Sequence, residues 1–464
     1  MLKWKAALSI SNAQWVIAGQ HWRSDGRGQS LSTPRGSRKL GQDFVLSLGQ
    51  RSGCATGGRP EEGTRDIMTV DIRLTHEFRE DGHYFRAVQL RVGTDKTFDL
   101  LPSWDDKVRL PSKIPNWWTP FTEVYARVTL SELREAREDA ARQGALLRRH
   151  FAPHSENTGL TITKVLVRPD EKVSEKDVDY LAHLFPLPGS VMPVVPLLYR
   201  YNLGPSGRVH ELKPVDPATY LSFAKHFTQT LRGEGVKEFA IAVPSNFAFS
   251  NIAPLLQLHK DDSTPLVVID CNGRGTEDLI SQIRTIVGAK KDGNPSLVQK
   301  HGSKFALYAF DMKPFRGRSD VVPALNLLHL DGGFSSFGRR HTIKMGGEDG
   351  SKPRSPPRPD QRRIIFPAKL AYARANVPEA VDGLKSWHKD NRSPPHDMLE
   401  TVLQTSREYE QEHLVGVARK MTEWAKSNEL HHVLDGHEHL RDEVRRLRKR
   451  NAQLLSTGTQ TTLL

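Results

Sequence analysis

The predicted fold rests on five apolar runs: PVVPLLYRYN (193–202), EFAIAVPSNF (238–247), PLVVIDCNGR (265–274), KFALYAFDMKPF (304–315) and LNLLHLDGGFSSFG (325–338). Each is a short, nearly continuous apolar stretch followed by polar residues or glycine. This pattern is typical of a buried strand that ends in a turn. Pro193 and Pro196 indicate that the first strand is irregular or lies at an edge.

Helical patterns separate these runs. Asp216 and Pro217 form a typical helix start, with Asp as the N-cap and Pro at the first helical position. Apolar residues then recur at helical spacing: Tyr220, Phe223, Ala224, Phe227 and Leu231. Strands that alternate with helices favour right-handed βαβ units. We therefore predict an α/β fold with a mainly parallel sheet or a (β/α)-barrel-like core.

Three of the runs end in an acidic residue: Asp270, Asp311 and Asp331. Ligands of parallel α/β proteins bind at the carboxyl ends of the strands, so we expect these carboxylates to share a site. There they could hold Mg²⁺ or divide acid and base roles in catalysis. The alternative is that each Asp only starts a turn or caps a helix.

The segment after Asp331 predicts an anion-binding loop. Glycines allow a ligand to approach the backbone, and arginines neutralise its charge. The residues expected to bind the substrate here are Gly332, Gly333, Ser335, Ser336, Arg339 and Arg340, with Asn246 and Arg274 from the preceding turns. Flexible, solvated loops are the alternative interpretation.

Composition changes along the chain indicate six segments. We predict a disordered basic extension (1–67), a small α+β domain (68–170), the α/β core domain (171–345), a linker (346–363), a helical region (364–426), and a short coiled coil with a tail (427–464). Residues 1–67 could come from a misassigned start codon, with Met68 as the true start, or could bind nucleic acid. Within the second segment, Thr129 and Glu132 have the spacing of a helix capping box.

The coiled-coil prediction follows from heptads near the C-terminus. Position a holds Leu430, His437, Val444 and Asn451, and position d holds Val433, Leu440, Leu447 and Leu454. Asn at position a is a register-setting residue of parallel dimers, so we expect a homodimer through residues 430–454. The alternative is a surface helix packed on its own domain.

Charge and motifs limit the function. The 464-residue chain has a net charge of +13, which favours phosphate-bearing or nucleic-acid partners. It lacks an apolar run long enough for a membrane-spanning helix and a clear signal peptide, so we expect a cytoplasmic protein without membrane contact. Cys271 is expected to be buried and inert. HExxH, GxSxG and protein-kinase signatures are missing.

We therefore predict an enzyme, a hydrolase or transferase, that acts on a phosphate-bearing or nucleic-acid substrate at the carboxyl ends of a parallel sheet. Asp270, Asp311 and Asp331 are its expected catalytic or Mg²⁺-binding residues. The alternative is a non-catalytic, dimeric nucleic-acid-binding protein, in which the positive charge is the function.

Overall fold

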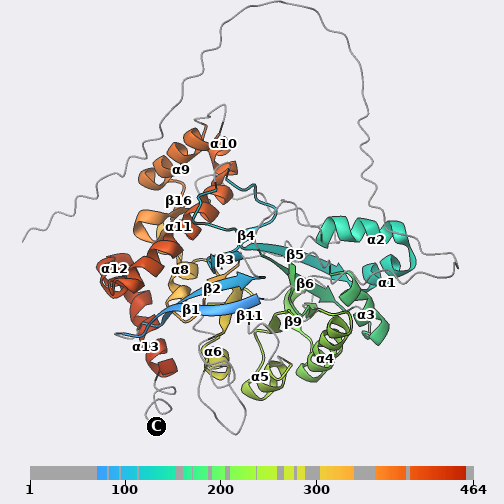
Figure 1. Ribbon diagram of the computed structural model, residues 1–464. Helices are drawn as coiled ribbons and strands as arrows, with labels where there is room; N and C mark the ends of the chain where they lie inside the picture. The colour runs from blue at the N-terminus through green and yellow to red at the C-terminus, as the bar shows by residue number, and fades with distance from the viewer. Residues whose placement is uncertain are drawn as a thin grey trace, which may run out of the picture. The chain divides into compact units, whose positions relative to one another are not determined.

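The computed structural model describes residues 70–80, 83–93, 96–111, 114–151, 160–169, 171–185, 191–203, 209–236, 238–258, 266–275, 279–287, 304–338, 361–392 and 398–455. All of them belong to one compact unit, Thr64–Leu464, with a mixed α/β fold (Figure 1). The predicted extension 1–67, most of the linker 346–363, and both Arg339 and Arg340 lie outside the described residues.

An antiparallel sheet begins the described chain. Its strands are β1 (Val70–Phe78), β2 (Phe85–Val92) and β3 (Lys96–Asp99). The alternation that predicted β1 is confirmed at Val70 and Ile72, which are both buried. The period-two pattern therefore places the apolar face of this hairpin against the rest of the unit.

The first parallel sheet contains β4 (Trp104–Asp105), β5 (Thr122–Thr129), β6 (Thr161–Arg168), β7 (Val191–Pro193) and β8 (Leu197–Leu203), with β9 (Val209–Pro214) antiparallel to β8. Its helices are α1 (Leu130–Glu138), α2 (Ala140–Leu146) and α3 (Glu175–His183), and a π-helical turn, η1 (Leu147–Phe151), follows α2. The capping box of α1 is confirmed, because Thr129 and Glu132 cap each other's backbone N–H groups. This sheet spans the domain boundary expected at residue 170, since β6 pairs with both β7 and β8.

The second parallel sheet has the order β10 (Ile241–Val243), β11 (Leu266–Asp270), β12 (Ala306–Phe310) and β14 (Ser336–Phe337). Its connecting helices are α4 (Pro217–Gly233), α5 (Phe249–Leu256), α6 (Ile280–Val287) and α8 (Leu325–Leu330). The start of α4 is confirmed, because the Asp216 side chain accepts a hydrogen bond of 2.9 Å from the Thr219 N–H. Parallel strands separated by helices thus confirm the α/β prediction.

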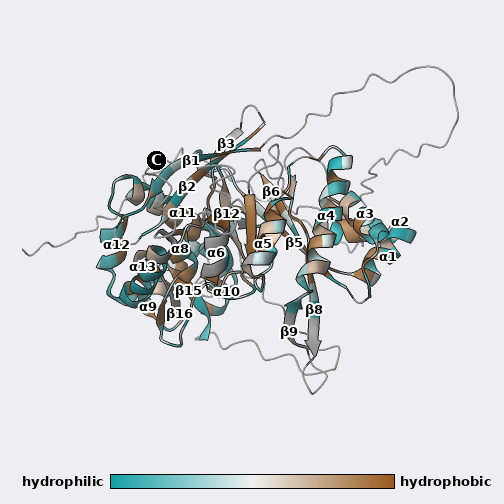
Figure 2. Ribbon diagram, turned by 90° about the horizontal axis from the view of Figure 1, so that it is seen from below, coloured by the Kyte–Doolittle hydropathy of each residue, from teal (hydrophilic) through white to brown (hydrophobic). Residues whose placement is uncertain are grey.

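Backbone hydrogen bonds join the two parallel sheets at both edges. On one side, an isolated parallel bridge pairs Val194 with Ala240, and the Val195 N–H donates to the Ala240 carbonyl over 2.9 Å. On the other side, the Ser103 N–H, directly before β4, donates to the Phe337 carbonyl of β14 over 3.0 Å. Helices α1, α3, α4, α5 and α6 contact one another in that order along the outside of the strands (Figure 1). Hydrophobic residues concentrate on central strands such as β12, whereas α2 has a hydrophilic outer face (Figure 2).

The run LNLLHL was predicted to be a strand, and this prediction was wrong. Residues Leu325–Leu330 form helix α8, and all six side chains are buried. An apolar run of this length does not distinguish a buried strand from a buried helical turn. The last parallel strand is instead β14, formed by Ser336 and Phe337.

The C-terminal part covers the unit with helices and a small sheet. The helices are α9 (Pro378–Asn391), α10 (Leu399–Gln404), α11 (Ser406–Lys426), α12 (Leu430–Gly436) and α13 (Arg441–Leu455), with the 3-10 turns η4 (Pro367–Lys369) and η5 (Glu438–Leu440). The sheet pairs β13 (Val321–Pro323), β16 (Ala371–Arg374) and β15 (Arg363–Phe366). No described helix is both long and apolar enough to cross a membrane.

The heptad residues pack on their own chain. Leu430, Leu440, Val444 and Asn451 are buried, and the Asn451 side chain donates to the Asp331 carbonyl over 2.7 Å. The helix also ends at Gly436, so the heptads do not run along one continuous helix. The described residues therefore show the alternative arrangement, a helix packed on its own domain, and they do not confirm a coiled coil.

Candidate functional site

Polar side chains line one face of the joined parallel strands. Paired residues of neighbouring parallel strands share a face, and residues two apart on one strand do so as well. The register pairs Tyr125 of β5 with Lys164 of β6, and Asp270 of β11 with Phe310 of β12. The buried polar residues on this face include Glu123, Lys164, Tyr199, Asp270 and Tyr308. Such residues are unusual there, because parallel strands covered by helices are normally apolar on both faces.

Lys164 and Asp270 form the centre of this group. The Lys164 Nζ lies 3.3 Å from the Asp270 Oδ1, and only 3% and 4% of the two side chains are exposed. The ammonium also lies 3.1 Å from the centroid of the Phe310 ring and 5.5 Å from that of Tyr125. The Tyr199 hydroxyl donates to the second Asp270 oxygen. The carboxylate therefore contacts a cation on one oxygen and a phenol on the other.

Burial keeps the neighbouring acidic groups protonated. It raises the pKa of the Tyr199 phenol well above its usual value, and the charge of Asp270 raises it further. Burial likewise raises the pKa of Tyr125, an effect that the nearby Arg127 opposes. The pKa of Cys271 is also raised well above its usual value by burial and then by Asp270. The Tyr199 phenol therefore stays protonated and can donate to Asp270, and Cys271 is the buried thiol that was predicted.

A second polar group lies deeper on the same face. The Tyr308 hydroxyl donates to the Glu123 Oε2 over 2.5 Å and lies 2.6 Å from the Ser103 Oγ. Residue 338 must be glycine for Glu123 to occupy this position. A Cβ on Gly338 would lie 1.8 Å from the Glu123 Oε2, which is too close for two non-bonded atoms. This group connects the ends of the two sheets through side chains.

The carboxyl ends of the strands carry positive charge and unusual backbone. Arg127 lies near the end of β5 and Arg168 is the last residue of β6, both on the same face as Lys164 and both partly buried. Asn272 and Asp311, which follow β11 and β12, have positive φ angles of 46° and 50°. Asn and Asp adopt this left-handed conformation more readily than other non-glycine residues, so both positions fit tight turns at the strand ends.

The structure brings two of the three predicted carboxylates to this edge. Asp270 is the last residue of β11 and pairs with Phe310, the last residue of β12, so Asp270 and Asp311 lie at the ends of adjacent strands. Asp331 does not join them. It follows α8 and precedes β14, and the Ser335 N–H donates to the Leu307 carbonyl near the amino end of β12. Asp331 therefore lies toward the opposite edge of the sheet, and the described residues contain no group of three metal-binding side chains.

Asp331 instead holds distant parts of the chain together. Its carboxylate accepts hydrogen bonds from the His83 Nδ1 over 2.5 Å and the Tyr84 N–H over 3.0 Å. The Arg448 Nε donates to the His83 Nε2 over 3.1 Å, so the two ring nitrogens of His83 connect Asp331 to Arg448. Burial raises the pKa of Asp331, and the His83 hydrogen bond opposes this shift.

The predicted anion-binding loop is packed rather than open. A Cβ on Gly332 would lie 2.3 Å from the Arg450 guanidinium, and one on Gly333 would lie 2.5 Å from the Tyr84 ring. Ser336 donates to the Leu101 carbonyl over 2.6 Å, and Ser335 is buried. These glycines therefore allow close packing, which explains their presence without a ligand.

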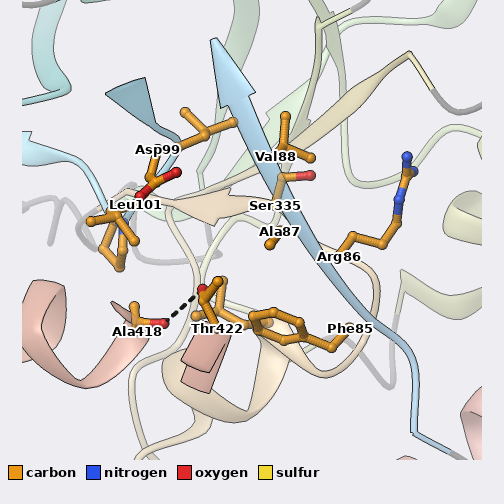
Figure 3. Close-up of a pocket in the computed structure, with 12 residues that line it drawn as sticks. Phe85, Arg86, Ala87, Val88, Asp99, Leu101, Ser335, Ala418 and Thr422 are labelled. Atoms are coloured by element: carbon orange, nitrogen blue, oxygen red, sulfur yellow. Dashed lines mark hydrogen bonds between the residues drawn. The ribbon is translucent and has the colours of Figure 1, made fainter. Parts of the chain in front are cut away.

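Two other predicted binding residues, Asn246 and Arg274, lie in the loops that follow β10 and β11, at the carboxyl ends of these strands. Asn246 is exposed in the turn after β10, and Arg274 is partly buried in the loop after β11. Ser335 lines a small pocket between β2, β3 and α11, together with Phe85, Arg86, Asp99, Leu101 and Thr422 (Figure 3). That pocket contains neither Lys164 nor Asp270.

The sequence interpretation missed Lys164, Tyr199 and Tyr125. A signal for one of them was present, since Lys164 interrupts the apolar strand run LTITKVLV. A charged residue in the middle of a predicted buried strand indicates a paired charge. No protein-family model matches the chain, and no curated protein matches it either.

Proposed function

We propose that the chain is an enzyme that acts on a phosphate-bearing substrate at the carboxyl ends of its parallel strands. The observation that carries this proposal is the buried Lys164–Asp270 pair, with Tyr199 on the second carboxylate oxygen. Burying two charges is costly, so a buried pair that points into a shared face is a candidate catalytic group. In this proposal Asp270 exchanges protons and Lys164 acts as a cation or an amine.

The proposed architecture is a closed ring of the parallel strands β4, β5, β6, β7, β10, β11, β12 and β14. The hydrogen bonds between Val195 and Ala240, and between Ser103 and Phe337, support this closure. The consecutive contacts of the outer helices support it as well. In (β/α) barrels the active site lies at the carboxyl ends of the strands, which is where Asp270 and Asp311 are.

Arg127 and Arg168 are the proposed phosphate-binding residues. They lie on the same face as Lys164, farther toward the carboxyl ends. Guanidinium groups bind phosphate through paired, charge-assisted hydrogen bonds. A phosphate held at this edge would leave the rest of a small substrate directed toward Lys164.

The test compares ligand binding by the wild-type chain and two variants. Inorganic phosphate, small phosphate esters and a single-stranded RNA are titrated, and both the thermal stability and the binding heat are measured. We expect phosphate esters to raise the melting temperature of the wild-type chain. Arg127→Gln should weaken their binding by about tenfold or more, which is the loss expected for a charge-assisted hydrogen bond. The control is Arg445→Gln, because Arg445 is exposed on α13.

Equal binding by both variants would contradict the proposal, as would the lack of any phosphate-ester binding. RNA binding that weakens steeply with salt and does not depend on Arg127 would favour the non-catalytic nucleic-acid-binding alternative.

A further inference from the structure

The environment of Lys164 is unusual for a lysine. Lysine side chains normally extend their ammonium group into water. Lys164 instead lies within β6, and its side chain is 3% exposed. Its amine points into the face shared with Asp270 and Phe310, which come from two other strands. The fold thus holds this amine in a fixed position beside a carboxylate.

These neighbours match the requirements of an amine that attacks a carbonyl group. The amine must first lose a proton, and Asp270 is placed 3.3 Å away to accept it. The resulting iminium is a cation, and the Phe310 ring 3.1 Å from the Nζ stabilises a cation at this position. The Tyr199 hydroxyl positions the carboxylate by donating to its other oxygen.

We propose that Lys164 forms an imine with the carbonyl group of the substrate. The inference rests on the proposed function and narrows its substrate class to a phosphate-bearing aldehyde or ketone. Asp270 takes one proton from the ammonium, and the free amine adds to the carbonyl carbon to give a carbinolamine. The carbonyl oxygen leaves as water with two protons that come from the ammonium, one of them returned by Asp270. The products are a protonated imine on Lys164 and one water molecule.

The position of Arg127 limits the size of this substrate. Tyr125 pairs with Lys164, and Arg127 is two residues farther along β5. Two residues of a strand span about 7 Å. A phosphate bound by Arg127 and a carbonyl at Lys164 therefore belong to a compact molecule, in which a few bonds separate the two groups.

The experiment traps the imine in the full chain. Dihydroxyacetone phosphate is the probe and sodium borohydride is the reductant, which converts an imine into a stable secondary amine. Peptide mass spectrometry then locates the label. Unphosphorylated dihydroxyacetone is the matched control ligand, and Lys225, exposed on α4, is the matched control lysine.

We expect one label per chain, on Lys164, and at least tenfold slower labelling by dihydroxyacetone. Asp270→Asn should slow the labelling by about 100-fold or more, which is the usual contribution of a general base. The peptide map of the labelled wild-type protein is sufficient to identify the labelled lysine. The result therefore does not depend on how well a variant folds.

Two further outcomes separate the imine from the proposed function. If phosphate esters bind and depend on Arg127, but Lys164 is unlabelled or is labelled no faster than Lys225, the imine is refuted and the proposed function stands. If no phosphate ester binds and no label forms on Lys164, both fail.

Discussion

Removal of one partner of the Lys164–Asp270 pair should destabilise the protein strongly. At 3.3 Å, two unit charges interact by about 5 kcal/mol with an effective dielectric constant of about 20. Neither side chain is exposed enough for water to replace the lost partner. We therefore expect Lys164→Met and Asp270→Asn each to lower the free energy of unfolding by about 3–5 kcal/mol.

The double variant distinguishes the pair from two independent contacts. The double variant leaves no buried charge without a partner. Its free energy of unfolding should therefore fall by about as much as that of one single variant. The coupling energy should then be about 3–5 kcal/mol, the same as the loss in one single variant. Methionine keeps most of the length of the lysine side chain, so the contact with Phe310 is largely retained.

Urea unfolding of the wild type, both single variants and the double variant gives these four free energies. Tryptophan fluorescence and circular dichroism should report the same transition midpoints, which supports a two-state treatment. Lys225→Met is the control and should change the free energy by less than about 0.5 kcal/mol. Single losses below about 1 kcal/mol, or additive losses in the double variant, would refute the reasoning.

Three further predictions concern stability. Burial lowers the pKa of His329 well below its usual value, so the unfolded chain takes up its proton first as the pH falls. Between pH 7 and pH 5 the free energy of unfolding of the wild type should therefore fall by about 2 kcal/mol more than that of His329→Leu. Urea unfolding at both pH values measures this difference, and an equal fall in the two proteins would contradict the prediction. Gly333→Ala should cost at least about 2 kcal/mol, because φ is 86° and the new Cβ would lie 2.5 Å from the Tyr84 ring. Gly235→Ala is the control, because Gly235 has a similar φ of 84° but its new Cβ would have no atom within 4 Å. If both variants lose the same free energy of unfolding, the contact with the Tyr84 ring has no effect. Leu440→Ala should cost about 2–5 kcal/mol at any protein concentration, whereas a melting temperature that rises with concentration would indicate the predicted dimer.

Local signals in the sequence predicted several elements correctly. Asp216 and Pro217 predicted the start of α4, and Thr129 with Glu132 predicted that of α1. Both are signals in which neighbouring residues satisfy each other's hydrogen bonds, so they do not depend on the rest of the fold. The strands β11 and β12 were also predicted, since a buried parallel strand is apolar on both faces.

The site could be predicted only in part, because its contacts are not local. The chain order of Asp270 and Asp311 correctly placed both acids at the carboxyl ends of adjacent strands. The partner of Asp270 is Lys164, 106 residues earlier, and that of Asp331 is His83, 248 residues earlier. Pairings over such distances depend on strand order and register, which the apolar pattern of a single strand does not contain.

The contact between Ser103 and Phe337 also has a consequence for protein synthesis. The two residues are 234 positions apart, so the edge at β4 has no partner until the ribosome has passed β14. At roughly 5–20 residues per second, this takes about 10–50 s. During that time the nascent chain exposes a strand edge that can pair with another chain. The attachment of the hairpin β1–β2 is completed later still. It includes the hydrogen bonds of Asn451 to Asp331 and of Arg448 to His83, and Arg448 and Asn451 are among the last described residues to be synthesised.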